Sequence, residues 1–279
     1  MRSRKRSCST AEVEHMSKEL ISTGPISRCM IVARTPSGIP GLDALIQGGI
    51  PVNSTIALRA EPCNATEYFQ QQFIAEGLKQ GHPAIYCCLS RPAATVINGL
   101  KHQGFDVLEQ IANDQLVLLD CYSLHTRTAT MGVDQAVQKK IISVTDVDDE
   151  GKLQDGLATA VERLSNLKSL RTVCENVAGT LTSRNAIEVM RWGRRAFADL
   201  RAFDTLNLHT FPAGVREDLF NVMAHDFDAV IEIKADQSSE RIRYFLNILK
   251  MRMTAIPHKV FELDTDSSLL SIRTVQKIT

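Results

Sequence analysis

Short apolar runs alternate with longer amphipathic segments along most of the chain. The runs are rich in β-branched and aliphatic residues, as in strands that are buried on both faces of a parallel sheet. The strands predicted in this way span residues 55–60, 84–90, 116–122, 172–177, 205–211 and 229–233. Between them, apolar residues return at three- and four-residue intervals, which predicts helices at 68–79, 93–102, 157–167 and 186–203. This alternation is typical of an α/β fold in which helices cover both faces of a mostly parallel twisted sheet.

The last third of the chain has a different pattern. Residues 241–252, 258–264 and 269–275 have the pattern of consecutive strands joined by short turns, which predicts an antiparallel C-terminal extension at one edge of the sheet.

The segment 123–155 is polar and less periodic, so we predict a long loop with some helix. Its acidic run, 146–151, partly resembles a calcium-binding loop. However, Leu157 stands where such a loop requires a bidentate Glu. A solvated loop is therefore the favoured interpretation.

Residues 1–30 combine charge, Ser and weak helical patterning, and they end near the breaker Thr23-Gly24-Pro25. We predict a flexible N-terminal tail at 1–30, with Met16 as an alternative start, followed by one domain at 31–279. The basic run Arg2 to Arg6 lacks the apolar stretch of a secretory signal, and no later stretch is long enough to span a bilayer. We therefore expect a cytoplasmic protein.

The composition of the chain narrows the range of partners and of metal or disulfide sites that we expect. Lys plus Arg and Asp plus Glu each number 32, which gives a formal net charge of zero, so no global field attracts nucleic acid or an anionic membrane. The seven Cys include no C-x-x-C pair, and the His residues are scattered, so we expect neither a metal site nor a disulfide framework. Most Cys lie in apolar runs, where they behave as small core hydrophobes.

The first predicted strand, 55–60, is followed by a tight loop and a helix, which is the layout of a phosphate-binding loop. A working loop reads G-x-x-x-x-G-K-[ST], with a Lys that neutralises phosphate and a hydroxyl that binds magnesium. Here Ala60 and Ala65 replace the glycines, Thr66 replaces the Lys and Glu67 replaces the hydroxyl. The degenerate loop positions are Ala60, Glu61, Pro62, Cys63, Asn64, Ala65, Thr66 and Glu67.

These replacements remove a cation and introduce an anion where a triphosphate would lie. Each lost charge-assisted contact is worth about 1.5 to 3 kcal/mol, and Glu67 would face the phosphates at short range. We therefore expect no cofactor. ATP with magnesium remains an alternative that these residues disfavour.

Three segments resemble KaiC-like and RadA-like members of the RecA superfamily. Residues 35–51 resemble the family pattern T-G-I-x-G-L-D-x-L-x-G-G-G-I-P, residues 72–81 resemble Q-F-L-x-E-G-L-x-x-G, and 249–252 resemble its C-terminal strand. The resemblance spans about residues 31–275 and implies a RecA-like, P-loop NTPase fold.

The chain departs from that family where catalysis would occur. Ser90-Arg91-Pro92 stands where the family has acidic residues that activate the attacking water, and Glu175, followed by Asn176, replaces the Walker B Asp. We accordingly assign no catalytic residue and no metal. The family resemblance also implies that Lys250 and Arg252 reach a neighbour's nucleotide, so both are interface candidates. The alternative is an exposed pair on a strand.

The leading functional hypothesis is a pseudo-ATPase that acts as a regulatory or scaffolding partner, in signal transduction or with an active paralogue, in a homo- or hetero-oligomer. A second hypothesis is a weak ATP-binding protein or ATPase in which Arg59 or Arg91 replaces the missing cation. A third is a mediator linked to DNA recombination or repair. Because the chain has neutral charge, one Trp and four Tyr, and no helix-turn-helix or zinc-finger pattern, nucleic acid is not the partner we expect.

Overall fold

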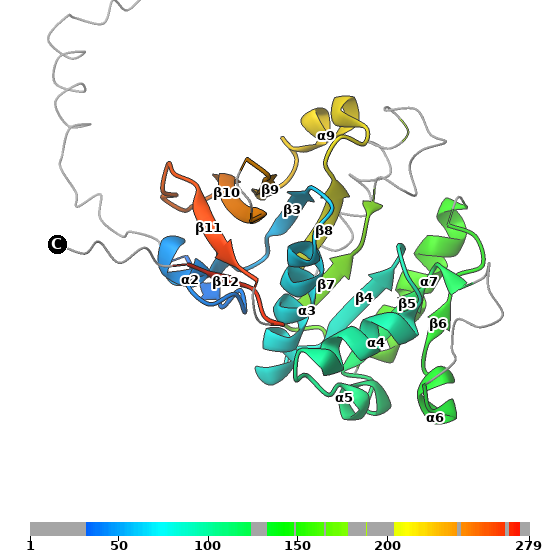
Figure 1. Ribbon diagram of the computed structural model, residues 1–279. Helices are drawn as coiled ribbons and strands as arrows, with labels where there is room; N and C mark the ends of the chain where they lie inside the picture. The colour runs from blue at the N-terminus through cyan, green and yellow to red at the C-terminus, as the bar shows by residue number, and fades with distance from the viewer. Residues whose placement is uncertain are drawn as a thin grey trace, which may run out of the picture. The chain divides into compact units, whose positions relative to one another are not determined.

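One large sheet organises the computed structural model, which describes residues 32–123, 133–147, 149–164, 166–177, 188, 204–238, 241–265 and 268–273. Its strands are β3 (Thr55–Ala60), β4 (Ala84–Cys88), β5 (Leu116–Asp120), β6 (Ile142–Ser143), β7 (Leu170–Cys174), β8 (Thr205–Pro212), β9 (Ala229–Asp236), β10 (Arg243–Met251), β11 (Phe261–Asp264) and β12 (Ser271–Ile272). Within the described residues, their order across the sheet is β12-β11-β10-β9-β3-β8-β7-β4-β5-β6 (Figure 1).

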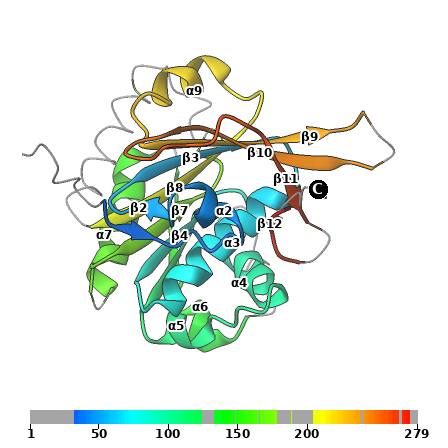
Figure 2. The same cartoon turned by 90° about the vertical axis from the view of Figure 1, so that its left-hand side faces the viewer.

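Strand pairing in the sheet changes from parallel to antiparallel at β9. The seven strands from β9 to β6 pair in parallel, whereas β10, β11 and β12 pair antiparallel with their neighbours. The hairpin of β9 and β10 extends beyond β3, because β9 pairs with β3 only as far as Ile233 (Figure 2). The predicted RecA-like class, a mostly parallel sheet with an antiparallel C-terminal extension, is confirmed.

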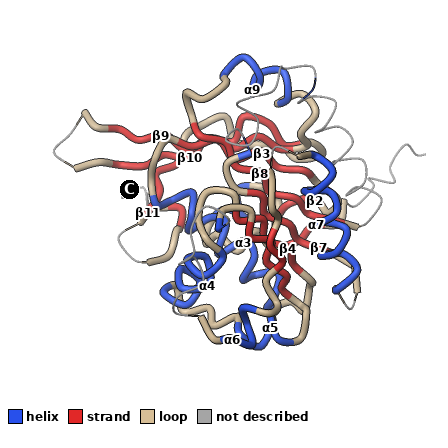
Figure 3. Tube along the Cα trace, turned by 90° about the vertical axis from the view of Figure 1, so that its right-hand side faces the viewer, coloured by secondary structure: helices blue, strands red, loops and turns tan. Residues whose placement is uncertain are grey.

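Helices cover both faces of the sheet (Figure 3). One face carries α3 (Asn64–Lys79), α4 (Ala93–His102) and α5 (Leu108–Ala112), and the other carries α7 (Glu150–Arg163) and α9 (Glu217–Met223). Successive strand residues point to opposite faces, so Ile56 and Leu58 pack on the α3 side while Ala57 packs on the α7 side. The shorter elements are β1 (Arg34–Thr35), α2 (Leu42–Leu45), β2 (Ile50–Pro51) and α6 (Gln135–Gln138).

Two helices begin earlier than predicted. The helix expected at 68–79 begins at Asn64, and the helix expected at 157–167 begins at Glu150 and ends at Arg163. The second difference has a clear cause, because the Asp149 side chain accepts hydrogen bonds from the amides of Gly151 and Lys152. The end of the acidic run is therefore a helix cap.

The segment predicted as a loop at 123–155 also contributes strand β6, which lies at one edge of the sheet. The helix expected at 186–203 lies outside the described residues except for position 188, and the tail expected at 1–30 lies wholly outside them. In the described part of the chain, we find no helix with both the length and the apolar character that a membrane span needs.

Candidate functional site

A cavity of about 410 Å³ opens beyond the carboxyl ends of the central parallel strands. In α/β sheets of this type, the crevice at those ends is the usual place for a ligand. Residues from the loop after β3, from α3 and from the ends of β4, β7 and β8 line this cleft. They are Ala60, Glu61, Pro62, Cys63, Thr66, Glu67, Gln70, Ser90, Arg91, Asn176, Thr210, Phe211 and Pro212.

The loop between β3 and α3 is short and has ordinary backbone geometry. Ala60 ends the strand, Cys63 is the N-cap and α3 begins at Asn64. Every residue from 60 to 67, all of which the structure describes, has a negative φ. No position in this loop therefore requires glycine, and Ala65 is fully buried in the core below the cleft.

The two positions aligned with the Lys and the hydroxyl both line the cleft. Thr66 Oγ1 lies 3.8 Å from Cys63 Sγ. Glu67 forms an ion pair with Arg91, with 2.6 Å between Oε2 and Nη1, and its other oxygen accepts a hydrogen bond of 2.9 Å from Gln71 Nε2. A carboxylate that is bound to a protein cation thus stands at the position that the sequence pattern aligns with the magnesium-binding hydroxyl.

Arg91 lies between two carboxylates. Its Nη2 and Nε lie 2.7 and 2.8 Å from Glu175 Oε1, while Nη1 contacts Glu67. Burial opposes the charged guanidinium, but the negative charge of Glu175, assisted by Glu67, outweighs burial and raises the pKa of Arg91. We call Glu67, Arg91 and Glu175 the Arg91 network.

Glu175 is the most buried member of this network, with a side chain only 1% exposed. Its Oε1 also accepts a hydrogen bond of 2.8 Å from the hydroxyl of Tyr86, and its Oε2 accepts one of 2.7 Å from Ser90 Oγ. Burial, followed by the charge of Glu175, raises the pKa of Tyr86, so Tyr86 remains a neutral donor. Groups of the protein thus satisfy both oxygens of the carboxylate.

Gln70 connects this network to β8. Its Nε2 donates to Thr210 Oγ1 at 2.9 Å, and its Oε1 accepts from Tyr86 at 3.2 Å and from Arg91 at 3.3 Å. The backbone amide of Asn176 donates to the same Thr210 hydroxyl at 2.9 Å. Asn176 has a φ of 41°, a left-handed conformation that Asn tolerates better than most residues.

Sequence reasoning missed Tyr86, Gln70 and Thr210. A signal was available in the glutamine run Gln70-Gln71-Gln72, whose members are all buried in α3. Buried amides require partners, and these three find theirs in different places: Gln70 at Thr210, Gln71 at Glu67, and Gln72 at the carbonyls of Gly38 and Leu270. Tyr86 and Thr210 lie in apolar strands and gave no comparable signal.

The two cations proposed as replacements for the Lys lie in different places. Arg91 lines the cleft, whereas Arg59 is not among its lining residues. Arg59 pairs with Glu217 at the start of α9, lies 3.9 Å from Glu232, and stacks 5.1 Å from the ring centroid of Phe220. Of the two, only Arg91 is placed to meet a ligand in this cleft.

Lys250 and Arg252 do not line the cleft either. Lys250 Nζ donates to the carbonyls of Ala224 and His225, at 3.2 and 2.9 Å. Arg252 Nη1 pairs with Asp228 Oδ1 at 2.7 Å. Burial, and next the charge of Arg252, lower the pKa of Lys250. Within the chain, both cations therefore hold the turn between α9 and β9.

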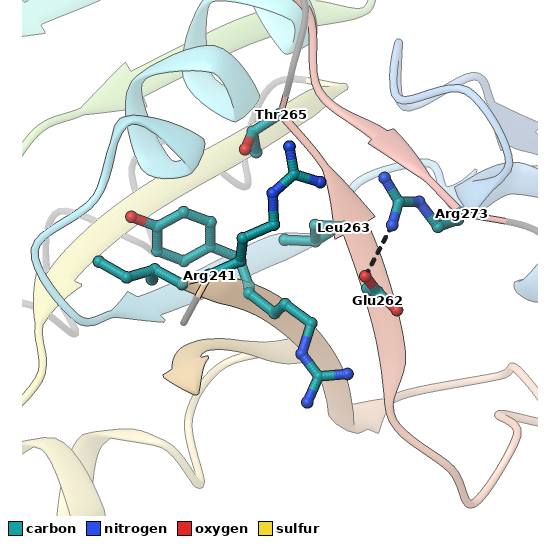
Figure 4. Close-up of a pocket in the computed structure, with 8 residues that line it drawn as sticks. Arg241, Glu262, Leu263, Thr265 and Arg273 are labelled. Carbon is teal, nitrogen blue, oxygen red and sulfur yellow. Dashed lines mark hydrogen bonds and ion pairs between the residues drawn. The ribbon is translucent and has the colours of Figure 1, made fainter. Parts of the chain in front are cut away.

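A second cavity, of about 460 Å³, lies on the antiparallel extension (Figure 4). Three arginines line it, but Arg273 pairs with Glu262 at 2.9 Å and Arg243 pairs with Asp236 at 3.0 Å. It includes none of the loop positions 60–67. Among the residues described, no group of three His, Cys, Asp or Glu side chains is arranged to hold a metal ion.

Comparisons with known proteins agree with this architecture. The model of the KaiC ATPase family matches residues 35–276. A UPF0273 protein of Sulfurisphaera tokodaii is 26% identical over 230 residues, which cover 81% of this chain and 77% of that protein. A UPF0273 protein of Thermotoga maritima is 25% identical over 229 residues, with 81% and 89% covered.

A solved structure gives the same picture of the fold. The crystal structure of a KaiC-like protein from the hyperthermophilic archaeon Pyrococcus horikoshii OT3 superposes with a TM-score of 0.68 and 16% sequence identity. The match covers 87% of this chain and 100% of that one. At this identity the likeness shows a shared fold.

Proposed function

Because the chain belongs to the KaiC ATPase family, we propose that it is a member that does not hydrolyse ATP and acts as a regulatory or scaffolding partner of other proteins. Its loop 60–67 lacks both the Lys and the hydroxyl of a working phosphate-binding loop. Ser90 and Arg91 follow β4 where a hydrolytic member would carry the acidic group that activates water.

The Arg91 network is the observation that carries this proposal. The cation nearest the expected phosphate position is compensated by Glu67 and Glu175, at 2.6 and 2.7 Å. A triphosphate entering this cleft would meet one compensated cation, Arg91, and the carboxylates of Glu61 and Glu67, which line it, where a working site offers a free lysine and a metal. Both the binding and the electrostatic stabilisation that phosphoryl transfer needs are therefore weakened.

A second candidate function is weak ATP binding or slow hydrolysis. It draws support from the cleft itself, which keeps a volume of about 410 Å³, and from Arg91, which lines it. In this alternative, Arg91 exchanges Glu67 for a phosphate and takes the role of the missing Lys.

Calorimetric titration of the full chain with ATP and magnesium distinguishes the proposed function from this second candidate. We expect no binding heat at concentrations that would detect a dissociation constant of about 1 mM, and no release of phosphate. The matched variant Ala60→Gly/Ala65→Gly/Thr66→Lys/Glu67→Ser restores both glycines, the Lys and the hydroxyl of the motif, and we expect it to bind. Measurable hydrolysis by the wild-type chain would overturn the proposal in favour of the second candidate.

The regulatory role would require contact with another subunit, for which Lys250 and Arg252 are our candidates. In a mixed oligomer, they would leave the turn between α9 and β9 and approach the neighbour's nucleotide, as trans-acting cations do. We expect the wild-type chain to change the ATPase rate of an active KaiC-family protein from the same cell. The Lys250→Ala chain should have a smaller effect, and the exposed control Lys234→Ala should act like wild type.

A further inference from the structure

Arg91 is a positioned cation with one nitrogen that Glu175 leaves free. Glu175 contacts Nε and Nη2 of the guanidinium, and Gln70 Oε1 accepts a further bond from Nη2 at 3.3 Å. Because Glu175 is itself held by Tyr86 and Ser90, this side of Arg91 is fixed. The remaining nitrogen, Nη1, contacts only Glu67 among the ion pairs of Arg91.

Glu67 is bound in a way that an external anion could reproduce. It lies in the first turn of α3, where the helix dipole and the free backbone amides favour negative charge. Its side chain is 29% exposed, and both Glu67 and Arg91 line the cleft. An anion approaching Nη1 through the cleft would therefore compete directly with this carboxylate.

We propose that Glu67 is the specificity-determining residue of the cleft, an internal anion that occupies Arg91 and excludes phosphate. The cleft would then be a latent site for a phosphate-bearing ligand. This inference rests on the proposed function, because it gives the reason why a retained cleft does not take ATP.

Glu67→Gln is the direct test, because it removes the charge and keeps a side-chain oxygen that can accept the bond from Gln71. The probe is inorganic pyrophosphate without magnesium, titrated calorimetrically into the full chain. A charge-assisted hydrogen bond is worth a tenfold step in affinity or more. We therefore expect Glu67→Gln to bind pyrophosphate at least about tenfold more tightly than wild type.

Two controls make the result specific. Glu217→Gln removes the carboxylate from the other arginine pair, Arg59, and changes the net charge equally, but Glu217 does not line the cleft. It should leave pyrophosphate affinity unchanged. Adding Arg91→Met to Glu67→Gln should abolish the gain.

Absence of a gain in a folded Glu67→Gln chain would overturn the inference, and so would an equal gain in Glu217→Gln. If Glu67→Gln lowers the midpoint of unfolding, Glu67→Ala provides the same comparison. The proposed function fails separately, through hydrolysis of magnesium-ATP by the wild-type chain, so the two failures are distinguishable.

Discussion

Glu175 shows how a single buried charge depends on its partners. Its side chain is 1% exposed and accepts bonds from Arg91, Tyr86 and Ser90. Removing one partner of a buried ion pair typically costs a few kcal/mol; here it leaves Arg91 with Glu67 alone and puts an amide NH₂ where a carboxylate oxygen accepted hydrogen bonds. We therefore expect Glu175→Gln to lower the free energy of unfolding by about 3 kcal/mol.

Urea unfolding followed by circular dichroism measures this change. Glu217→Gln is the matched control, because Glu217 also pairs with an arginine but is 43% exposed. Such an exposed pair is worth up to about 1 kcal/mol. Equal losses in the two variants would contradict the special role of burial at Glu175.

His209 adds a pH dependence to stability. It is buried on β8, and burial lowers its pKa to about 4, whereas an unfolded His titrates near 6.5. Below pH 6.5 the unfolded chain binds a proton that the folded chain does not, so stability contributed by neutral His209 is lost as pH falls from about 6.5 towards 4. The free energy of unfolding should fall by about 2 kcal/mol between pH 7 and pH 5 from this residue alone.

The comparison of wild type with His209→Gln isolates that contribution from other titrating groups. Urea unfolding of both chains at pH 7 and pH 5 should show the larger loss in wild type. Parallel losses would mean that His209 titrates alike in the folded and unfolded chains.

At the scale of elements, Arg171 joins three parts of the fold. Arg171 lies in β7 and is only 1% exposed. Its guanidinium donates hydrogen bonds to the carbonyls of Phe73 in α3 and Pro36 beside β1, at 2.8 and 2.9 Å. A third bond of 2.9 Å reaches Thr35 Oγ1. Burial lowers the pKa of Arg171 to about 10, so it stays charged at neutral pH. Gly77 makes room for it, since a Cβ there would lie 2.4 Å from Arg171 Cδ.

Arg171→Met keeps much of the side-chain length but removes the donors. The buried bond to the Phe73 carbonyl and the partly buried bonds to the Pro36 carbonyl and the Thr35 hydroxyl are then lost, and a buried group left unsatisfied costs about 1 to 3 kcal/mol. We expect the free energy of unfolding in urea to fall by at least about 3 kcal/mol. Arg273→Met, which removes an exposed pair with Glu262, should cost about 1 kcal/mol or less. A similar loss of unfolding free energy in the two variants would show that the Arg171 contacts stabilise the fold no more than an exposed ion pair does.

The element boundaries show what the sequence pattern could and could not predict. Buried parallel strands were recognisable because both faces are apolar, as in β4 and β5. The start of α3 was missed because its N-cap, Cys63, makes no side-chain cap bond and so gives no signal. Strand β6 was missed because a strand of two residues has no measurable period.

At the scale of the whole molecule, the cleft was predictable but its electrostatics were not. The spacing after the first strand singled out positions 60–67, and six of these eight residues line the cavity. The pairing of Arg91 with Glu175 joins residues 84 positions apart. It depends on the strand order, which places β7 beside β4. Local spacing carries no information about which charges a crossover brings together.

The formal net charge is a property of the whole molecule, and it bears on whether the protein binds nucleic acid. Lys plus Arg equals Asp plus Glu at 32 each, and at Arg91, Arg243 and Arg273 the structure shows carboxylate partners. Binding to nucleic acid draws on cations that release counterions. We expect no binding of a 30-nucleotide single strand in fluorescence anisotropy at about 150 mM salt. Proteins that bind nucleic acid non-specifically at such salt do so with dissociation constants of about 10⁻⁴–10⁻⁶ M.

If binding occurs, a variant in which Arg2, Arg4, Lys5 and Arg6 are all neutralised tests its source. Loss of binding in this variant would assign it to the basic N-terminal run. Binding that survived in this variant and weakened steeply with salt would contradict the prediction and revive a DNA-linked function for the domain.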